Sequence, residues 1–332
     1  MKIAFFELEP WEEEVLRHAF PKDKLFFSTK KLCHSDFKKV SDYDIITTFV
    51  NCKINKKVID SLPNLKFIAT MSTGYDHIDL EICSQKNIKV SNVPFYGENT
   101  VAEHTFALIL GLSRKLVNNV DFIREKKYYF GGFRGFDLRG KTIGVVGGGS
   151  IGQHVVRIAK GFEMNVLVFD LKQDKKLAKK IGFKYVSLDN LLKNSDIVSL
   201  HVPYNKHTHH LIDKKSFSIM KEGAYLINTS RGGIVETDAL LQALRSKKLA
   251  GAGLDVLEDE GLMGRKKLRR DIKEADFKLI TENKKLLKMG NVLITPHCAF
   301  NTQEAITRIL DTTIDNINSF KKGKVKNEVK FG

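Results

Sequence analysis

The length, composition and charge of the chain set the first limits on what it can be. It has 332 residues, 42% of them hydrophobic and 28% charged, and no apolar run approaches the ~18 residues that cross a bilayer. The formal net charge is +16, but the basic residues are spread along the chain without zinc-finger spacing, an RNP-like strand or a basic arm. We therefore expect no membrane partner, disfavour nucleic-acid binding, and expect the charge to attract small anions.

The N-terminus and the cysteines favour a cytoplasmic location. The opening MKIAFFELEPWEEE turns acidic after a short apolar run, unlike a secretory signal. Its four cysteines lack the paired spacing of a zinc site or a disulfide framework. They are Cys33, Cys52, Cys83 and Cys298. We predict reduced thiols and no metal site.

Strand-like runs alternate with helical patterns from the first residues onward. The first series is KIAFFEL, KLFFS, DIITTFV, KFIAT and IKVSN, all before residue 93. A second series follows residue 140 and consists of TIGVV, NVLVFD, DIVSLHV, AYLINTS, LAGAGLDV and NVLITPH. Alternation of this kind predicts parallel sheets with helices on both faces. The predicted fold class is therefore α/β, with two doubly wound parallel-sheet domains.

A long helical pattern, residues 100–127, lies between the two series. Its first half, Val101 to Leu112, is apolar nearly all the way round, so such a helix must be covered on every side. Burial within the chain and packing against a second subunit both account for this, and we expect a homodimer through residues 98–125. An amphipathic helix follows residue 302, and residues 257–290 form a Lys-rich insertion, expected to be a partly helical surface loop.

A glycine pattern marks the expected cofactor site. Gly147, Gly149 and Gly152 form G-x-G-x-x-G directly after the strand TIGVV and before a helical stretch. The glycines allow a tight turn and close approach of a pyrophosphate, and the N–H groups at the helix start bind the phosphates. Asp170 ends the next strand, 18 residues beyond Gly152. A carboxylate there binds the ribose hydroxyls and repels a 2′-phosphate, so it favours NAD over NADP, although Lys172 weakens this preference.

Three further motifs are INTSRGGIV (227–235), GLDVLEDE (253–260) and ITPHCAF (294–300). Together with NVPFYGENTVAEHTFALIL and DLRGKTIGVVGGGSIG, they make the chain resemble the D-isomer-specific 2-hydroxyacid dehydrogenases, and most closely the D-lactate dehydrogenases among them. The resemblance implies a flavodoxin-like substrate domain of residues 1–97 and 299–332, with a Rossmann NAD-binding domain of residues 98–298 inserted into it. It also implies reversible reduction of a 2-keto acid such as pyruvate by NADH.

The resemblance assigns catalytic roles to Arg231, Glu260 and His297, and each role has a physical reason. A guanidinium binds a carboxylate and polarises a carbonyl through its fork of N–H groups. Imidazole is a proton donor that works near neutral pH, and the other nine histidines lie in no context comparable to that of His297. A carboxylate on the second ring nitrogen fixes the tautomer and favours the protonated ring. Glu258 and Asp259 flank Glu260, so this last assignment depends on the family's register.

The resemblance also implies contacts with the cofactor and the substrate. For each of these residues, a role in a turn or in packing is the alternative explanation. The cofactor contacts are Gly147, Gly149, Ser150, Ile151, Gly152, Asp170, Val202, Pro203, Thr208, Thr229, Ser230 and Asp255. The substrate contacts are Thr73, Gly74, Tyr96 and Phe300. Glycine in the Ser72–Gly74 turn lets backbone N–H groups approach a carboxylate. The two aromatic residues favour a pyruvate-like acid over glyoxylate or phosphoglycerate.

Two other functions fit parts of the pattern. A dinucleotide-sensing binding protein or transcriptional co-regulator on the same fold would account for the positive charge. Phosphite or formate oxidation on a related scaffold is disfavoured by the substrate-loop pattern. Since a fold alone does not settle chemistry, the choice of substrate rests on the aligned side chains.

Overall fold

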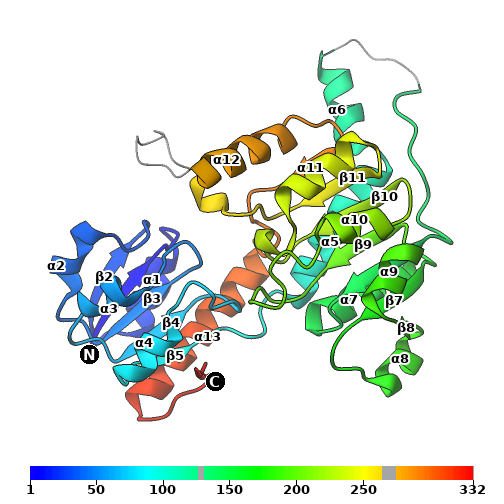
Figure 1. Cartoon of the computed structure of the whole chain (residues 1–332). Coiled ribbons are helices and arrows are strands. Elements are labelled where there is room, and N and C mark those ends of the chain that lie inside the picture. The colour runs from blue at the N-terminus through cyan, green and yellow to red at the C-terminus, as the bar shows by residue number, and fades with distance from the viewer. Residues whose placement is uncertain (126–130, 264–273, 332) are drawn as a thin grey trace. The chain divides into compact units, whose positions relative to one another are not determined.

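Two parallel β-sheets organise the chain, one in each of two compact units (Figure 1). The computed structural model describes residues 1–125, 131–263 and 274–331. The first unit comprises Met1–Tyr96 and Thr302–Gly332, and the second comprises Gly97–Asn301. Among the described residues, no helix has the length and apolar character needed to span a membrane.

The first unit is built on a five-stranded sheet in the order β2-β1-β3-β4-β5. Its strands are β1 (Lys2–Phe6), β2 (Lys24–Ser28), β3 (Ile45–Thr48), β4 (Phe67–Thr70) and β5 (Lys89–Ser91). All of them pair in parallel, so the five predicted strand runs and the flavodoxin-like order are confirmed. Strands β3 and β4 are buried at every position, as expected for a sheet covered on both faces.

Helices cover this sheet. They are α1 (Glu12–Ala19), α2 (Phe37–Val40), α3 (Lys56–Asp60), α4 (Leu80–Gln85) and α13 (Gln303–Lys321). The last of these is the predicted amphipathic helix, and its Phe320 ring stacks on Phe67 of β4 with centroids 4.3 Å apart. The end of the chain is thus part of the same core as its beginning.

The second unit is built on a seven-stranded parallel sheet in the order β12-β11-β10-β9-β6-β7-β8. Its strands are β6 (Thr142–Val146), β7 (Asn165–Phe169), β8 (Lys184–Tyr185), β9 (Ile197–Leu200), β10 (Ala224–Asn228), β11 (Leu249–Leu254) and β12 (Val292–Ile294). The strand order reverses at β6, which pairs with β7 on one side and β9 on the other. Ligands bind beyond the carboxyl ends of the strands at such a switch point.

Two apolar clusters fill the two faces of the second sheet. One contains side chains of α5 (Glu98–Ser113), α7 (Ser150–Gly161) and α8 (Lys175–Ile181). The other contains side chains of α9 (Leu188–Asn194), α10 (Lys214–Ile219), α11 (Thr237–Arg245) and α12 (Glu274–Leu286). The doubly wound fold class is confirmed by this arrangement.

Three details differ from the sequence prediction. The single helix expected over residues 100–127 is two helices, because Lys115 adopts a positive φ of 51° between α5 and α6 (Leu116–Glu125). Residues 126 and 127 lie outside the described residues. The two-residue strand β8 was not predicted, because two residues are too few to show periodicity. The insertion at 257–290 contains α12, as expected of a partly helical segment, while residues 264–273 lie outside the described residues.

Candidate active site

The three residues predicted to be catalytic follow three neighbouring strands of the second sheet. Arg231 follows β10, Glu260 follows β11 and His297 follows β12. The register pairs Asn228 with Leu254 and Leu254 with Ile294, so these strands end side by side. Parallel strands place the turns after their carboxyl ends at one edge of the sheet.

The turn that carries His297 is held by Asp255. The backbone N–H of His297 donates to the Asp255 carbonyl over 2.8 Å. The Asp255 carboxylate, only 1% exposed, accepts hydrogen bonds from the N–H groups of Cys298 and Ala299, each over 2.9 Å. His297 has a φ of 52°, in the left-handed region that residues other than glycine rarely adopt. Such a conformation persists where surrounding bonds impose it, which occurs often at functional sites.

Glu260 is the carboxylate that contacts His297. Its Oε1 lies 2.5 Å from His297 Nδ1, and its Oε2 accepts a hydrogen bond from the Leu257 N–H. Glu258, the alternative in the sequence, is used elsewhere: its Oε1 lies 2.6 Å from His210 Nε2 and its Oε2 accepts from the Thr237 hydroxyl. The geometry therefore places Glu260, not Glu258, where it fixes the orientation of the imidazole.

Arg231 lies in a turn that Asn228 holds from both sides. The Asn228 Nδ2 donates to the Arg231 carbonyl over 2.9 Å, and its Oδ1 accepts from the Ser230 N–H and hydroxyl. A Cβ on Gly232 would lie 2.0 Å from the Leu257 carbonyl carbon, so this turn approaches the backbone of the Glu260 loop as only glycine allows. The turns that carry Arg231 and Glu260 are thus packed backbone to backbone.

The glycine loop after β6 has the geometry that a pyrophosphate requires. Gly147 has a φ of 102°, and a Cβ on Gly152 would lie 2.0 Å from the Gly147 carbonyl oxygen. Nothing lies within 4 Å of a Cβ on Gly149, so a ligand can approach there. Ser150 and Ile151 open α7, whose first turn has no side-chain cap. Its N–H groups are therefore available to phosphate oxygens, and this loop fits the dinucleotide.

The acid at the end of the next strand also supports the loop. Asp170 follows β7, and its carboxylate accepts hydrogen bonds from the N–H groups of Gly148 and Lys172, each over 2.7 Å. A carboxylate so fixed retains acceptor capacity for ribose hydroxyls.

The remaining cofactor candidates line the same edge of the sheet. Val202 and Pro203 follow β9, where the Thr208 hydroxyl donates to the Pro203 carbonyl over 2.6 Å. Thr229 follows β10, is 8% exposed and lies 2.9 Å from the Thr105 hydroxyl of α5. Thr208 and Thr229 therefore already hold turns, whatever cofactor contacts they make.

In the first unit, the predicted substrate loop follows β4. The Ser72 hydroxyl donates to the Gly74 carbonyl, and the Thr73 hydroxyl donates to the Val93 carbonyl. Tyr96 is partly exposed, and its carbonyl accepts a hydrogen bond from Arg308 Nε over 2.7 Å. Phe300, the fourth predicted substrate residue, belongs to the second unit and is partly exposed.

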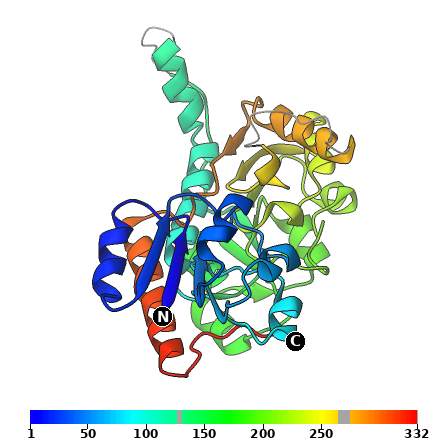
Figure 2. The ribbon, with the colours of Figure 1, turned by 90° about the vertical axis from the view of Figure 1, so that its left-hand side faces the viewer.

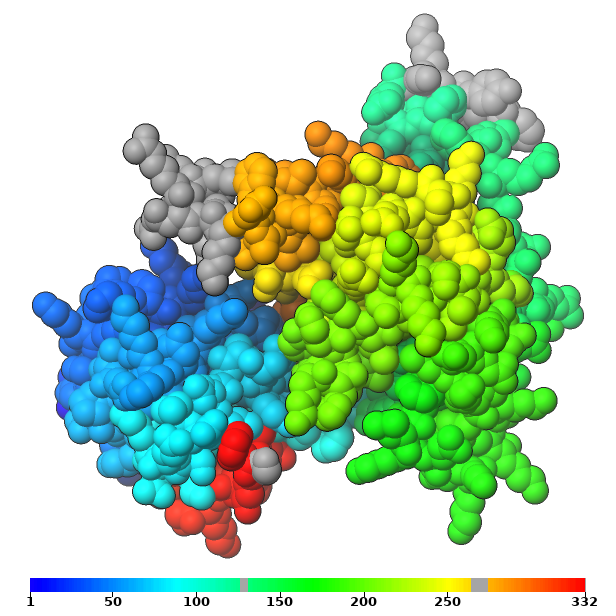
Figure 3. Space-filling view, in the orientation of Figure 1, coloured from blue at the N-terminus to red at the C-terminus, as the bar shows by residue number. Residues whose placement is uncertain are grey.

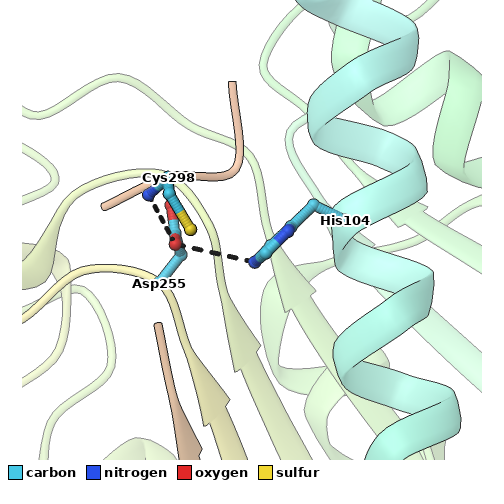
Figure 4. A group of neighbouring side chains, drawn as sticks. All are labelled: His104, Asp255 and Cys298. Carbon is cyan, nitrogen blue, oxygen red and sulfur yellow. Dashed lines mark hydrogen bonds and ion pairs between the residues drawn. The ribbon is translucent and has the colours of Figure 1, made fainter. Parts of the chain in front are cut away.

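The sequence analysis missed one histidine beside this site. His104 of α5 points toward Asp255 and Cys298 (Figure 4), and its Nε2 lies 3.6 Å from Asp255 Oδ1 and 3.0 Å from the Thr295 hydroxyl. One ligand atom from each of His104, Asp255 and Cys298 lies within 4.8 Å of the others. No local pattern revealed this group, because His104 is 151 residues from Asp255 in the sequence.

A Rossmann sheet with a histidine–carboxylate pair beyond its carboxyl edge is typical of the dinucleotide-dependent oxidoreductases. The sequence profile of the D-isomer specific 2-hydroxyacid dehydrogenase, NAD binding domain, matches residues 106–299. A glyoxylate reductase from Thermococcus litoralis is 36% identical over 97% of this chain and 89% of its own length. A 2-hydroxyacid dehydrogenase homolog from Zymomonas mobilis is 34% identical, and the match covers 98% of each chain.

Solved structures give the same result. D-lactate dehydrogenase from Aquifex aeolicus, complexed with NAD and lactic acid, has a TM-score of 0.88 at 37% identity, covering 97% of this chain and 96% of that one. The apo-structure of D-lactate dehydrogenase from Escherichia coli has a TM-score of 0.84 at 32% identity, covering 99% and 100%. The chain belongs to the D-isomer-specific 2-hydroxyacid dehydrogenase family, and it is an NAD-binding oxidoreductase.

Proposed function

We propose that this enzyme reduces a 2-keto acid of the pyruvate type to the D-2-hydroxy acid, with NADH as reductant and His297 as proton donor. The observation that carries the proposal is the contact between His297 Nδ1 and Glu260 Oε1. These two residues follow β12 and β11, and β11 is the neighbour of β10, which Arg231 follows. With Nδ1 engaged, Nε2 is the ring nitrogen that donates the proton.

Each catalytic side chain has a defined task in this proposal. The bound nicotinamide supplies a hydride to the keto carbon. The Arg231 guanidinium binds the substrate carboxylate and polarises the carbonyl. The protonated His297 ring gives its proton to the oxygen as negative charge develops there and becomes neutral. Glu260 stabilises the positive charge that the ring carries before this transfer and keeps the ring oriented. In the reverse direction His297 accepts the hydroxyl proton.

The substrate pocket is part of the same proposal. Among the described residues, the backbone N–H groups of Thr73 and Gly74 donate no hydrogen bond, so these groups are available to a carboxylate. We assign Tyr96 to the substrate carboxylate and Phe300 to the pocket for the substrate side chain, and these two aromatic residues favour pyruvate over glyoxylate. Relatives described as glyoxylate reductase make glyoxylate the competing substrate.

The proposal also covers the domain roles and the assembly. We assign substrate binding to residues 1–97 and 299–332 and NAD binding to residues 98–298, in a cytoplasmic homodimer. The exposed apolar side chains of α6 support the dimer. They are Leu116, Val117, Val120 and Ile123. Helix α6 extends away from the rest of its unit in both ribbon views (Figures 1 and 2). Apolar surface of this kind marks a protein interface.

Steady-state kinetics test the proposed reaction. The purified enzyme and NADH are assayed with pyruvate, glyoxylate, phenylpyruvate, 2-ketoisocaproate, oxaloacetate and hydroxypyruvate, and then with NADPH. We expect the highest kcat/KM for pyruvate with NADH, and D-lactate as the product. Arg231→Ala should lower kcat/KM by about 100-fold or more, because it removes the carboxylate's charged partner.

The matched control is Arg245→Ala, which removes an exposed guanidinium at the end of α11 and should leave the kinetics unchanged. Inactivity of the unmodified enzyme with all six acids would overturn the proposal in favour of dinucleotide sensing. A higher kcat/KM for glyoxylate than for pyruvate would overturn only the assignment of substrate.

A further inference from the structure

We propose that His104 of α5 is a positioning residue for the proton donor His297, and that it acts through Thr295 and Asp255. The inference rests on the proposed function, since it concerns the group that donates the proton. It adds a further histidine–carboxylate pair to the site, and this histidine comes from a helix that carries none of the predicted catalytic residues.

The directions of the hydrogen bonds in this chain are fixed by its chemistry. The Thr295 hydroxyl lies 2.5 Å from Asp255 Oδ1, and because a carboxylate only accepts, the hydroxyl proton points to Asp255. Thr295 Oγ1 then has no second proton, so it accepts its other hydrogen bond, 3.0 Å long, from His104. His104 must therefore carry a proton on Nε2.

Asp255 transmits this interaction to the catalytic turn. Its two carboxylate oxygens and its carbonyl oxygen accept the N–H groups of three successive residues: Cys298 on Oδ1, Ala299 on Oδ2 and His297 on the carbonyl. The chain of contacts thus runs from His104 to Thr295, to Asp255, and to the backbone on both sides of the imidazole. His297 keeps its positive φ because these bonds hold it.

Charge supports the same arrangement. Asp255 is 1% exposed, and a buried carboxylate needs hydrogen-bond donors or a cation. Among the described residues, His104 is the basic side chain within ion-pair distance of Asp255, at 3.6 Å. Removing His104 would leave the buried Asp255 carboxylate with fewer partners, and the orientation of this carboxylate determines the conformation of the turn that carries His297.

A metal site is the rival explanation for the group in Figure 4. Asp255 Oδ1 already accepts hydrogen bonds from Thr295 and Cys298, and Oδ2 accepts one from Ala299. Burial raises the pKa of the Cys298 thiol, and the nearby Asp255 carboxylate raises it further, so the thiol stays protonated at neutral pH. A metal ion would have to displace these bonds and that proton, and the positioning role requires neither.

Four variants test the role of His104. His104→Phe removes the donor and keeps a flat ring, Thr295→Val removes the hydroxyl, and the double variant removes both. His104→Gln keeps an N–H donor at the end of a side chain of similar reach. We expect kcat for pyruvate reduction to fall about 10- to 100-fold in each of the first two, because a misplaced proton donor slows the chemical step. The KM for NADH should change less than about twofold, because the glycine loop and Asp170, which bind the pyrophosphate and the ribose, are unchanged in these variants.

Two comparisons separate positioning from a general loss of stability. The double variant should be no slower than the slower single variant, because either change already breaks the chain of hydrogen bonds. His104→Gln should recover most of the wild-type kcat. Thr313→Val, which removes a buried threonine hydroxyl in the first unit, should change the thermal stability without changing kcat.

The outcomes separate this inference from the proposed function. If wild type is active but His104→Phe keeps the wild-type kcat, or if the two single effects multiply in the double variant, only the inference falls. If wild type is inactive with every acid, the proposed function falls first and takes this role with it. A loss of wild-type activity on EDTA dialysis that zinc restores would replace positioning by the metal site.

Discussion

At the residue scale, histidines bonded to carboxylates, directly or through one hydroxyl, dominate the site. His297 bonds to Glu260, His210 bonds to Glu258, and His104 reaches Asp255 through Thr295. The sequence predicted only the first pair, because ITPHCAF was the histidine-containing motif to which the resemblance assigned a catalytic role. The carboxylate partners of His104 and His210 are 151 and 48 residues away in the sequence. A local sequence pattern does not predict a contact over such a separation.

A fourth histidine has a consequence for stability. The His201 ring, after β9, bonds to the Ser199 hydroxyl through Nε2, and no described residue bonds its buried Nδ1. Burial lowers the pKa of His201 from 6.5 to about 3. Between these values the unfolded chain binds a proton that the folded chain does not, so the free energy of unfolding falls as the pH falls from 6.5 toward 3.

Calorimetry across this range measures the effect. We expect His201 to remove about 2 kcal/mol of stability between pH 6.5 and pH 5, at about 1.4 kcal/mol per pH unit. His201→Gln should flatten this dependence, and His207→Gln, at an exposed position, should not. An unchanged dependence of the melting temperature on pH in His201→Gln would show that the ring is not the group responsible.

At the element scale, the turns after β10, β11 and β12 behave as one structure. Asn228 binds the Arg231 turn, and its carbonyl accepts the Asp255 N–H, while Asp255 binds the His297 turn. The sequence placed all three turns at one sheet edge because parallel strands require it. It could not show that they support one another, since those contacts depend on the strand order and on backbone approach.

Gly232 tests this coupling. A Cβ there would lie 2.3 Å from the Glu258 N and 2.0 Å from the Leu257 carbonyl carbon, so Gly232→Ala must move one of two backbones. We expect kcat/KM for the keto acid to fall about 10- to 100-fold, because the Arg231 turn or the Glu260 loop shifts. Gly261→Ala is the control, since a Cβ there meets nothing within 4 Å. Equal kinetics for both variants would show that the two turns are independent.

At the scale of the whole molecule, the sequence predicted both sheets and their parallel strands, because each strand is a strongly apolar run next to a turn signal. Strand β8 and the break at Lys115 were missed, since the first is too short to show a period and the second occurs inside a continuous helical pattern. That break separates the largely buried α5 from α6, which stands out from its unit in the space-filling view (Figure 3).

The exposed face of α6 predicts the oligomeric state. Val120 is 38% exposed and Ile123 is 41% exposed, on the same face of the helix. We expect light scattering after size exclusion to give twice the 37.7 kDa chain mass. Val120→Asp with Ile123→Asp should give the monomer mass, because charge in an apolar interface is unfavourable. A wild-type monomer at micromolar concentration would contradict the proposed dimer.

The central claim is that His297 and Arg231 act on one bound keto acid beside the nicotinamide. A crystal structure of the complex with NADH and oxamate, an unreactive analogue of pyruvate, tests it most directly. The account predicts that His297 Nε2 lies within about 3 Å of the amide carbonyl oxygen of oxamate, which takes the place of the keto oxygen of pyruvate. It also predicts that the Arg231 guanidinium pairs with the oxamate carboxylate. An oxamate bound beside the nicotinamide with either side chain more than about 6 Å away would contradict it, because neither proton transfer nor charge pairing reaches that far without a bridge.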